Sequence, residues 1–371
     1  RAGTNFIGLC PFHNEKTPSF NVSPSRQIFH CFGCHKGGDV FTFLREFENL
    51  TFVESVQRLA ERARIPIEFE MNSGQREEGS LREKLRTLHE QVARRWETTL
   101  ANDANVQAAR DYLAKRGISD EAVKRFRIGF APDEWNDTVN WAKSKKHDTG
   151  LLEKGGLAIA GDKGHYDRFR GRLIFPICDE QGRVIGFSGR VLSAEQKGGK
   201  YINSPETPIF SKRRVIYGLH KAKRPILNAK SVIVCEGQLD IIACHLADIE
   251  NTVAPQGTAL TADHARILKR YAEEVVLCFD SDTAGQQAAL RSLDDLLASG
   301  LAIRVAVIPQ PHDPDSFIRE KGADTFRQLI ADAPGFFDFL LDYLCRVHDA
   351  SSDRGRINIV QEMRDAVQKT A

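Results

Sequence analysis

The chain has 371 residues, enough for two to four domains, and its 41% apolar and 27% charged residues are ordinary for a globular protein. No apolar run approaches the roughly 20 residues needed to cross a bilayer, and eight cysteines over this length do not form the disulfide framework of a small secreted domain. The net charge of +2 is so small that its distribution along the chain is more informative than its sum.

The start of the chain and its cysteines indicate where the protein works. The first residue is Arg1 rather than Met and no signal peptide is present, so we expect a fragment of a longer protein. Cys235, Cys244 and Cys278 lie within apolar patterns, which predicts buried free thiols. Free thiols are typical of a reducing compartment, and we therefore expect a cytoplasmic protein.

Two pairs of candidate metal ligands lie near the start of the chain. Cys10 and His13 form a Cys-x₂-His pair, Cys31 and Cys34 form a Cys-x₂-Cys pair, and seventeen residues separate the pairs. The two-residue spacing lets each pair bend around one ion, and three sulfurs with one nitrogen suit a closed tetrahedral Zn²⁺ site. The pattern predicts one structural zinc in a ribbon that depends on the metal for folding.

The residues around these pairs leave two questions open. His30 and His35 are alternatives to His13 as the fourth ligand, although His13 completes the paired geometry. Aromatic and basic side chains also alternate through this region, namely Phe12, Phe20, Phe29, Phe32 and Phe41 with Lys16, Arg26 and Lys36. Such side chains can stack bases and hold the phosphates of a single strand, or the rings can form the small core, and we expect a mixture.

The next segments alternate between predicted helices and irregular stretches. Strands are expected at 19–23 and 27–30, and helices at 40–47, 52–60, 81–100 and 106–116. Residues 71–80 are rich in Gly, Ser and charge, which predicts a flexible linker. Residues 150–228 are rich in strand and turn signals.

Charge is distributed unevenly over the second half of the chain. Residues 162–230 hold fifteen Lys and Arg against six Asp and Glu, a net of +9, whereas residues 231–317 hold five against thirteen, a net of −8. A basic region beside an acidic one suits a polyanion held next to a metal site. The alternative is a pair of ordinary solvated surfaces.

Carboxylates follow three successive apolar runs in the acidic region. Residues 231–235 lead into Glu236, 275–279 into Asp280 and Asp282, and 303–308, after a turn, into Asp313 and Asp315. The runs predict buried parallel strands separated by helices, and ligands of such sheets bind at the carboxyl ends of the strands. Converging carboxylates repel one another unless cations neutralise them, and Mg²⁺ or Mn²⁺ suits oxygen ligands. Ordinary polar strand ends are the alternative.

This arrangement resembles the Toprim fold, the catalytic module of bacterial primases, topoisomerases and some nucleases. The resemblance implies acid/base chemistry for Glu236 and metal binding for Asp280 and Asp282. Asp313 and Asp315 match the further acidic pair of the primases, and together with Glu236, Asp280 and Asp282 they are expected to hold the catalytic ions. Two or more catalytic Mg²⁺ or Mn²⁺ ions are implied by the same resemblance.

The first part of the chain strengthens this resemblance. Residues 5–6, 10–20 and 29–34 are similar to the zinc-binding domain of bacterial DnaG-type primases. The segments 168–172, 182–190, 200–207 and 209–212 resemble the basic motifs of the primase polymerase core. This match implies contacts to template or incoming nucleotide for Arg168, Arg170, Arg190, Lys200, Asn203 and Lys212, and for Arg116 in 112–117.

The resemblance implies a DNA primase, which synthesises short RNA primers on single-stranded DNA from ribonucleoside triphosphates. The zinc ribbon is then expected to contact the template, and a replicative helicase is expected to bind a C-terminal domain that this chain lacks. Two other classes of function remain. One is another Toprim enzyme, either a topoisomerase or a nuclease; the other is a non-catalytic zinc-ribbon module that binds single-stranded nucleic acid.

These inferences combine into a multidomain α/β and α+β fold. We expect a zinc-ribbon DNA-binding domain at 1–70, the linker at 71–80 and a mixed α+β basic N-terminal subdomain of an RNA polymerase core at 81–228. A Toprim domain with a parallel α/β sheet is expected at 229–318, followed by a truncated helical subdomain at 319–371.

Overall fold

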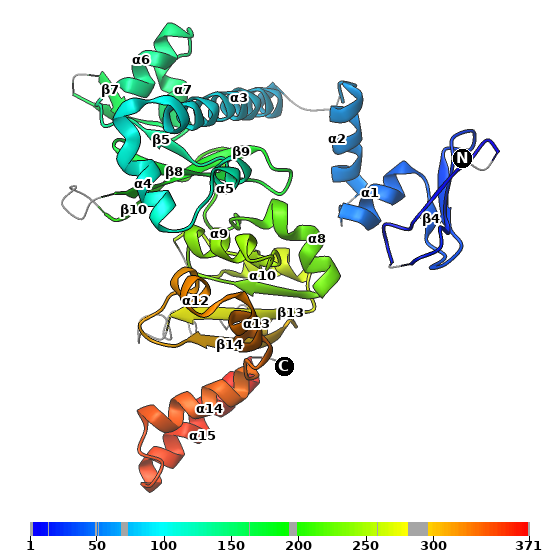
Figure 1. Cartoon of the computed structure of the whole chain (residues 1–371), viewed down its shortest axis with the longest axis vertical. Helices are drawn as coiled ribbons and strands as arrows, with labels where there is room; N and C mark the ends of the chain where they lie inside the picture. The colour runs from blue at the N-terminus through cyan, green and yellow to red at the C-terminus, as the bar shows by residue number, and fades with distance from the viewer. Residues whose placement is uncertain are drawn as a thin grey trace. The chain divides into compact units, whose positions relative to one another are not determined.

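The computed structural model describes the chain except for residues 1–2, 14, 49, 51, 68–72, 163, 193–198, 258, 281–295 and 370–371, and the side chains of residues 73, 75 and 280. The described part divides into two compact units, Arg1–Gly74 and Gln75–Ala371 (Figure 1). Each unit is described by itself below. No described helix combines the length and the apolar composition needed to cross a membrane.

The first unit is a small antiparallel sheet followed by two helices. The strands are β1 (Phe6–Gly8), β2 (Phe20–Ser23), β3 (Ile28–Cys31) and β4 (Gly37–Gly38), paired in that order, and the helices are α1 (Val40–Glu48) and α2 (Phe52–Ala63). Phe20 and Phe29 are buried with ring centroids 5.4 Å apart, and Phe12 and Phe43 pack against them. Phe32 is 67% exposed, so the rings of this unit divide between core and surface.

The second unit begins with helices that cover an antiparallel sheet. The helices are α3 (Ser73–Asn102), the 3₁₀ helix η1 (Ala104–Val106), α4 (Gln107–Lys115), α5 (Asp120–Phe126), α6 (Asp137–Ser144) and α7 (Thr149–Lys154). The sheet order is β10 (Tyr201–Asn203), β9 (Val184–Val191), β8 (Arg172–Cys178) and β5 (Gly129–Ala131), and β6 (Ala158–Gly161) pairs with β7 (Gly164–Asp167). Trp96 of α3 packs against Phe187 of β9, with centroids 4.8 Å apart.

Helix α3 occupies most of the segment for which the composition predicts a linker. The prediction of a flexible stretch at 71–80 is therefore wrong from Ser73 onward. Glu78 and Arg82 form an i,i+4 ion pair at 2.7 Å, and Glu and Arg are good helix formers. Extending an existing helix costs less than starting one, so the amphipathic pattern after residue 80 propagates backwards through the glycine and serine.

A parallel sheet follows, in the order β12 (Thr252–Val253), β11 (Ser231–Val234), β13 (Glu274–Asp280) and β14 (Ala302–Ile308). Helices α8 (Leu219–Ala229), α9 (Gln238–Leu246), α10 (Ala262–Lys269) and α12 (Pro314–Lys321) accompany it. Ile233 and Val276 contribute to the core on one face, while Val232 and Val275 contribute to the core on the other. Burial on both faces explains the continuous apolar runs in the sequence.

Buried thiols line the first of these two faces. Cys235, Cys244 and Cys278 are at most 1% exposed and unpaired by disulfides, which confirms the prediction made from their apolar surroundings. They fill space as small hydrophobic side chains.

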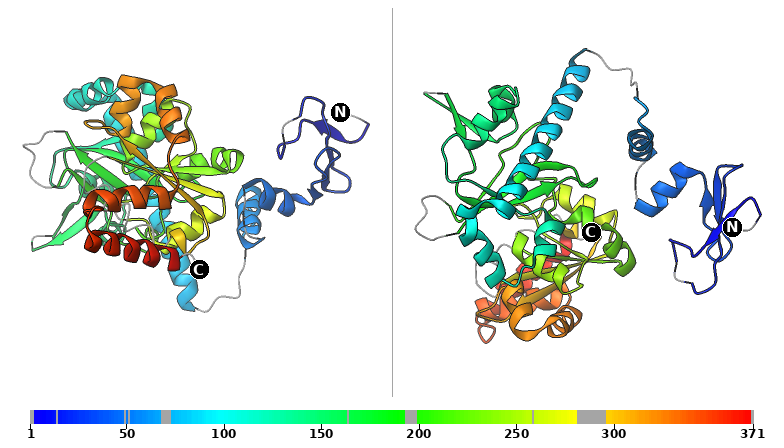
Figure 2. Two further views of the ribbon diagram at one scale, coloured as in Figure 1. Left: turned by 90° about the horizontal axis from the view of Figure 1, so that it is seen from below. Right: turned by 45° about the horizontal axis from the view of Figure 1, so that its top comes forward.

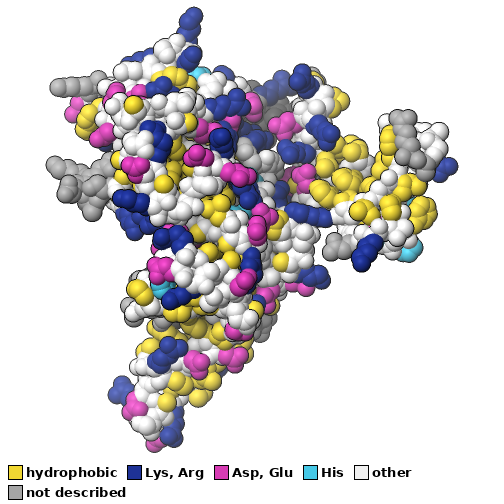
Figure 3. All heavy atoms as spheres, viewed as in Figure 1, with side chains coloured by type: hydrophobic (Ala, Val, Ile, Leu, Met, Phe, Trp, Pro, Cys, Tyr) yellow, Lys and Arg dark blue, Asp and Glu magenta, His cyan; other side chains and the backbone are white. Residues whose placement is uncertain are grey.

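Three further helices of the described chain follow the parallel sheet. The first adds Phe326 and Ile330 to the core on the first face, and the other two extend the core on the second face. The three helices are α13 (Ala323–Ala331), α14 (Phe336–Val347) and α15 (Asp353–Gln368), and α14 and α15 lie side by side (Figure 2). Phe336, Phe339 and Leu344 of α14 belong to the core on that face. Hydrophobic side chains also remain on the surface of this pair (Figure 3). Leu341 of α14 and Val360 of α15 are among the exposed ones.

Candidate functional site

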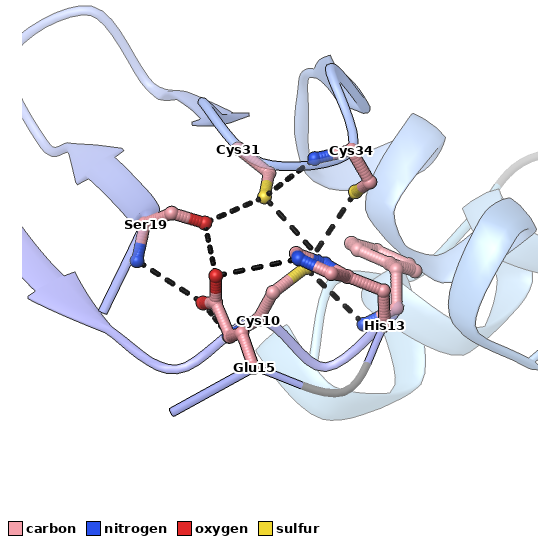
Figure 4. Close-up of polar contacts among 7 residues, drawn as sticks. Cys10, His13, Glu15, Ser19, Cys31 and Cys34 are labelled. Carbon is pink, nitrogen blue, oxygen red and sulfur yellow. Dashed lines mark hydrogen bonds and ion pairs between the residues drawn. The ribbon is translucent and has the colours of Figure 1, made fainter. Parts of the chain in front are cut away.

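The predicted zinc ligands of the first unit come together around one point. The ligand atoms of Cys10, His13, Cys31 and Cys34 all lie within 4.8 Å of one another (Figure 4). The Sγ atoms of Cys10 and Cys34 are 3.8 Å apart, as are Cys31 Sγ and His13 Nδ1. Zn–S bonds of about 2.3 Å in a tetrahedron place two sulfurs roughly 3.8 Å apart, so the spacing of these atoms fits zinc.

The alternative histidines take no part in this group. His30 packs against Phe32, with ring centroids 4.8 Å apart, and its own centroid lies 6.5 Å from that of His35. Among the described residues, the group capable of holding a metal contains His13 and neither of the other two. The hairpin of β2 and β3 explains this, because it carries Cys31 and Cys34 back to the Cys10–His13 turn.

Glu15 is a residue of this centre that the sequence did not single out. Its carboxylate accepts hydrogen bonds from the Cys10 N–H at 2.8 Å, the Ser19 N–H at 3.0 Å and the Ser19 hydroxyl at 2.5 Å. Hydrogen bonds from Ser19 lower the pKa of Glu15, so the group stays charged. His13 Nε2 lies 3.3 Å from Glu15 Oε2, which leaves Nδ1 for the metal.

Backbone amides also contribute to the centre. The Phe12 N–H points at Cys10 Sγ at 3.3 Å, and the Cys34 N–H points at Cys31 Sγ at 3.4 Å. Amide donors stabilise the thiolate form that a metal requires. The cysteines, the histidine and their outer partners therefore form a complete four-ligand site with its supporting shell.

A second candidate site lies in the second unit, at the carboxyl end of the parallel sheet. Val234 of β11 is in register with Leu277 of β13, so Glu236, just after β11, and Asp280, at the end of β13, belong to the same edge of the sheet. A cleft of about 290 Å³ opens at this edge. Six of the described residues that the sequence predicted line it, namely Arg116, Arg190, Lys200, Asn203, Glu236 and Asp313.

Carboxylates form one wall of this cleft. Glu236 is exposed, and Asp240 in the first turn of α9 accepts a hydrogen bond from the Gly237 N–H at 3.0 Å. Asp313 caps the N-terminus of α12 by accepting from the Ser316 N–H at 2.7 Å. Burial raises the pKa of Asp313, but hydrogen bonds from Ser316 and the charge of Arg116 outweigh it and lower the pKa overall. Asp280 ends β13, whereas Asp282 lies outside the described residues.

Cations and aromatic rings also line the cleft and form its cationic wall. The Arg190 guanidinium donates to the Tyr201 hydroxyl and lies 5.0 Å and 5.3 Å from the rings of Tyr201 and Tyr112. Arg116 lies 5.2 Å from the same Tyr112 ring. Burial opposes its charge, but Tyr112 and Asp315 raise the pKa of Arg116, so it stays protonated. The cleft thus brings fixed positive charge and carboxylates that can hold hard cations into one lining.

Comparison with known proteins follows the same division of the chain. Three family models match it: the CHC2 zinc finger over residues 1–75, the N-terminal domain of the DNA primase catalytic core over 96–223, and a Toprim-like domain over 233–318. A DNA primase of Clostridium acetobutylicum is 39% identical over all of this chain, and one of Halalkalibacterium halodurans is 38% identical.

A solved structure settles the family. The crystal structure of the Aquifex aeolicus primase, comprising its zinc-binding and RNA polymerase domains, is 32% identical with a TM-score of 0.67 and is matched over 100% of this chain and 88% of that one. The chain belongs to the DnaG primase family. It spans 61% and 62% of the length of the two curated relatives. The DnaG primase catalytic domain bound to ssDNA is 35% identical with a TM-score of 0.70, matched over 78% of this chain and 92% of that one.

Membership of the DnaG family confirms the predicted fold class of zinc ribbon, mixed basic subdomain and Toprim sheet. Three residues that the basic motifs predicted do not belong to the lining of the cleft, as far as the described residues show it. Arg168 donates to the Asn203 carbonyl at 3.2 Å, Arg170 stacks on Trp135 at 4.3 Å, and the Lys212 N–H donates to Glu206 at 2.8 Å.

Asp315, the second carboxylate of the DnaG-type Asp-Pro-Asp motif, has a different environment from Asp313. Its side chain is buried, and its two oxygens accept hydrogen bonds from Arg116 and, at 3.2 Å, from Arg319. It is absent from the described lining of the cleft. The sequence could not distinguish Asp313 from Asp315, because both are acidic residues of one turn.

Proposed function

We propose that this chain is the zinc-binding and RNA-polymerase part of a primase that makes short RNA primers on single-stranded DNA from ribonucleoside triphosphates, releasing pyrophosphate. The observation that supports this most is the cleft, which is lined both by Glu236, Asp240 and Asp313 and by Arg116, Arg190 and Lys200. Carboxylates together with cations suit a triphosphate that arrives with divalent metal ions. A protein that only binds nucleic acid gains nothing from carboxylates beside phosphates.

The carboxylates are proposed to hold two or more Mg²⁺ or Mn²⁺ ions. Glu236, Asp280, Asp282 and Asp313 have the oxygen ligands that these hard ions prefer. Such ions, when bound, lower the pKa of the attacking 3′-hydroxyl and neutralise charge on the leaving group. Glu236 is exposed in the cleft, and we assign to it the transfer of the hydroxyl proton.

The cationic wall is proposed to orient the nucleotide. Arg190, buried between two tyrosine rings, presents its guanidinium in a fixed direction, as phosphate recognition requires. Lys200 is exposed and offers a point charge to the same phosphates. Arg168, Arg170 and Lys212, outside the cleft, are assigned to the template, as is the surface of the zinc ribbon.

The chain is proposed to consist of four parts and to have one protein partner. We propose a zinc-binding domain at 1–70, a basic subdomain ending at residue 228, a Toprim domain at 229–318 and a helical subdomain from 319. A replicative helicase is proposed as a partner of this protein.

Primer synthesis on single-stranded DNA tests the function directly. The protein is incubated with single-stranded DNA, labelled ribonucleotides and Mg²⁺ or Mn²⁺. Short RNA products that depend on template and metal are expected. Relaxation of supercoiled DNA or cleavage of the template, in place of RNA products, would instead favour the other Toprim activities. Absence of all three activities would favour a non-catalytic binding module.

Two lysines test the division between cleft and template surface. Lys200→Ala is expected to raise the KM for nucleotides about tenfold, because a charge-assisted phosphate contact is lost. Lys212→Ala is expected to leave this KM within twofold and to weaken DNA binding. The slope of the logarithm of the binding constant against the logarithm of the salt concentration should become shallower by about 0.7, because one phosphate contact is lost. Steady-state kinetics and DNA titrations at several salt concentrations measure both, and Lys321→Ala, at the exposed end of α12, is the control. Wild-type behaviour of both variants would make these lysines ordinary surface residues.

A further inference from the structure

Asp315 lies at the meeting point of two segments that are far apart in the sequence. It belongs to the first turn of α12, beside the parallel sheet, while Arg116 caps the C-terminus of α4, among the helices that begin the second unit. The two residues are 199 positions apart and form an ion pair in which the Asp315 side chain is 3% exposed and that of Arg116 is 23% exposed. Asp315 therefore connects the acidic part of the cleft to its cationic wall.

The oxygens of Asp315 are already committed to cations of the protein. Oδ2 accepts from Arg116 and Oδ1 accepts from Arg319 Nε at 3.2 Å. A divalent ion at the same oxygens would bring a third positive centre into contact with two guanidinium groups, and the repulsion would be strong in a buried position. Asp313 differs, because it lines the cleft and has no guanidinium group on its side-chain oxygens among the hydrogen bonds and ion pairs of the described residues.

Helix geometry explains why neighbouring carboxylates of one motif have different roles. Each residue of a helix is rotated by about 100° from the last, so side chains two positions apart at a helix start project in different directions. Asp313 lies at the N-cap, with one oxygen on the Ser316 N–H and its charge at the cleft. Asp315, two residues further, is turned toward α4 and toward Arg319.

Besides its ion pair with Asp315, Arg116 has a cation–π contact with the ring of Tyr112. Its guanidinium lies 5.2 Å from the Tyr112 ring, and Arg190 lies 5.3 Å from the same ring. Both arginines line the cleft. Arginine is strongest as a phosphate ligand when its planar fork is fixed in advance, and a buried carboxylate behind the guanidinium fixes it.

We propose that Asp315 is a positioning residue that holds Arg116 toward the bound nucleotide, and that it is not a ligand of the catalytic metal ions. This rests on the proposed function, since the nucleotide is the ligand of the cleft. Asp313 is the member of the Asp313–Asp315 pair that we assign to the metal ions.

The test compares Asp315→Asn with Asp313→Asn in the whole protein. Binding of Mn²⁺ is measured by electron paramagnetic resonance, and binding of ATP by titration with a fluorescent ATP analogue; neither needs primer synthesis. Asp315→Asn is expected to weaken ATP binding about tenfold and to leave Mn²⁺ binding unchanged, because a fixed charge-assisted contact becomes mobile. Asp313→Asn is expected to weaken Mn²⁺ binding. Arg319→Ala, which removes the other partner of Asp315, should leave ATP binding within twofold.

A double-mutant cycle shows whether Asp315 acts through Arg116. Asp315→Asn should have no further effect on ATP binding once Arg116 is replaced by Ala, because there is nothing left to position. Additive effects, weaker Mn²⁺ binding in Asp315→Asn, or rescue of that variant by excess Mn²⁺ would each overturn the proposal. If Asp315→Asn melts below the assay temperature, Arg116→Lys replaces it: the charge stays but the fork is lost, and unchanged ATP binding would overturn the proposal. Absence of primer synthesis by the wild type would count against the proposed function alone.

Discussion

Replacement of Asp280 by Asn is expected to reduce primer synthesis by about a thousandfold or more while leaving the protein folded. Asp280 is the last residue of β13, and Glu236 follows the neighbouring strand β11, so the two groups share one edge of the sheet. If the proposed metal site is right, neutralising one carboxylate removes a charged ligand from the ions and weakens their hold on the triphosphate. The same loss is expected for Asp282→Asn.

The stability of the Asp280→Asn and Asp282→Asn variants should not fall with their activity. Without metal, the carboxylates at this edge repel one another, so removing one charge should leave the free energy of unfolding unchanged or raise it slightly. Thermal melts in EDTA, beside synthesis assays on the same preparations, measure both quantities. An Asp that merely forms a structural ion pair would lose stability and keep activity.

Asp248 offers a matched control for these variants. It is exposed between α9 and β12, at the amino edge of the same sheet, and its backbone has a φ of 57°, a conformation that Asn accepts well. Asp248→Asn should therefore melt and synthesise primers like the wild type. Near-normal synthesis by Asp280→Asn would contradict the metal assignment and, with it, most of the case for an enzyme.

Elements with a simple burial pattern were predictable from the sequence. The runs at 231–235, 275–279 and 303–308 are β11, β13 and β14, since strands covered on both faces must be apolar throughout. Strand β12 was missed because it contains only Thr252 and Val253, too few residues to show any period. The linker at 71–80 was wrong because composition does not account for helix propagation from a neighbouring segment.

The residues of the candidate sites likewise fall into those that local sequence patterns predict and those that depend on contacts between distant segments. Spacing along the chain was enough to bring Cys10, His13, Cys31 and Cys34 together, because a tight turn fixes each pair locally. Glu15 was missed, since a lone Glu among polar residues has no pattern and its contact with His13 exists only in the folded ribbon. The environment of Asp315 depends on Arg116, 199 residues away, which no local pattern reports.

Loss of a single zinc ligand is expected to unfold the first unit and leave the second intact. The core of residues 1–74 consists of a few rings and cysteines, so the free energy of metal binding is most of its folding free energy. Cys31→Ser should reduce the zinc content from one per chain to nearly none and abolish the melting transition of this unit. Elemental analysis and calorimetry measure the two effects.

Histidine variants identify the fourth ligand. His13→Ala should lose zinc as Cys31→Ser does, whereas His30→Ala and His35→Ala should retain it, because the described residues place both outside the ligand group. Full zinc content in His13→Ala would transfer the fourth position to one of the other two histidines.

Glu15→Gln distinguishes a supporting carboxylate from a bystander. The amide keeps the shape of the side chain and can still accept from the Ser19 and Cys10 amides, but it loses the charge that faces His13 Nε2 at 3.3 Å. Zinc should remain bound, with its affinity reduced by about 10- to 100-fold, as is usual when the outer partner of a ligating histidine is lost. Competition with a chromogenic chelator measures this affinity. Wild-type affinity would mean that Glu15 shapes the turn alone, whereas complete loss of zinc would mean that the turn itself cannot form without the carboxylate.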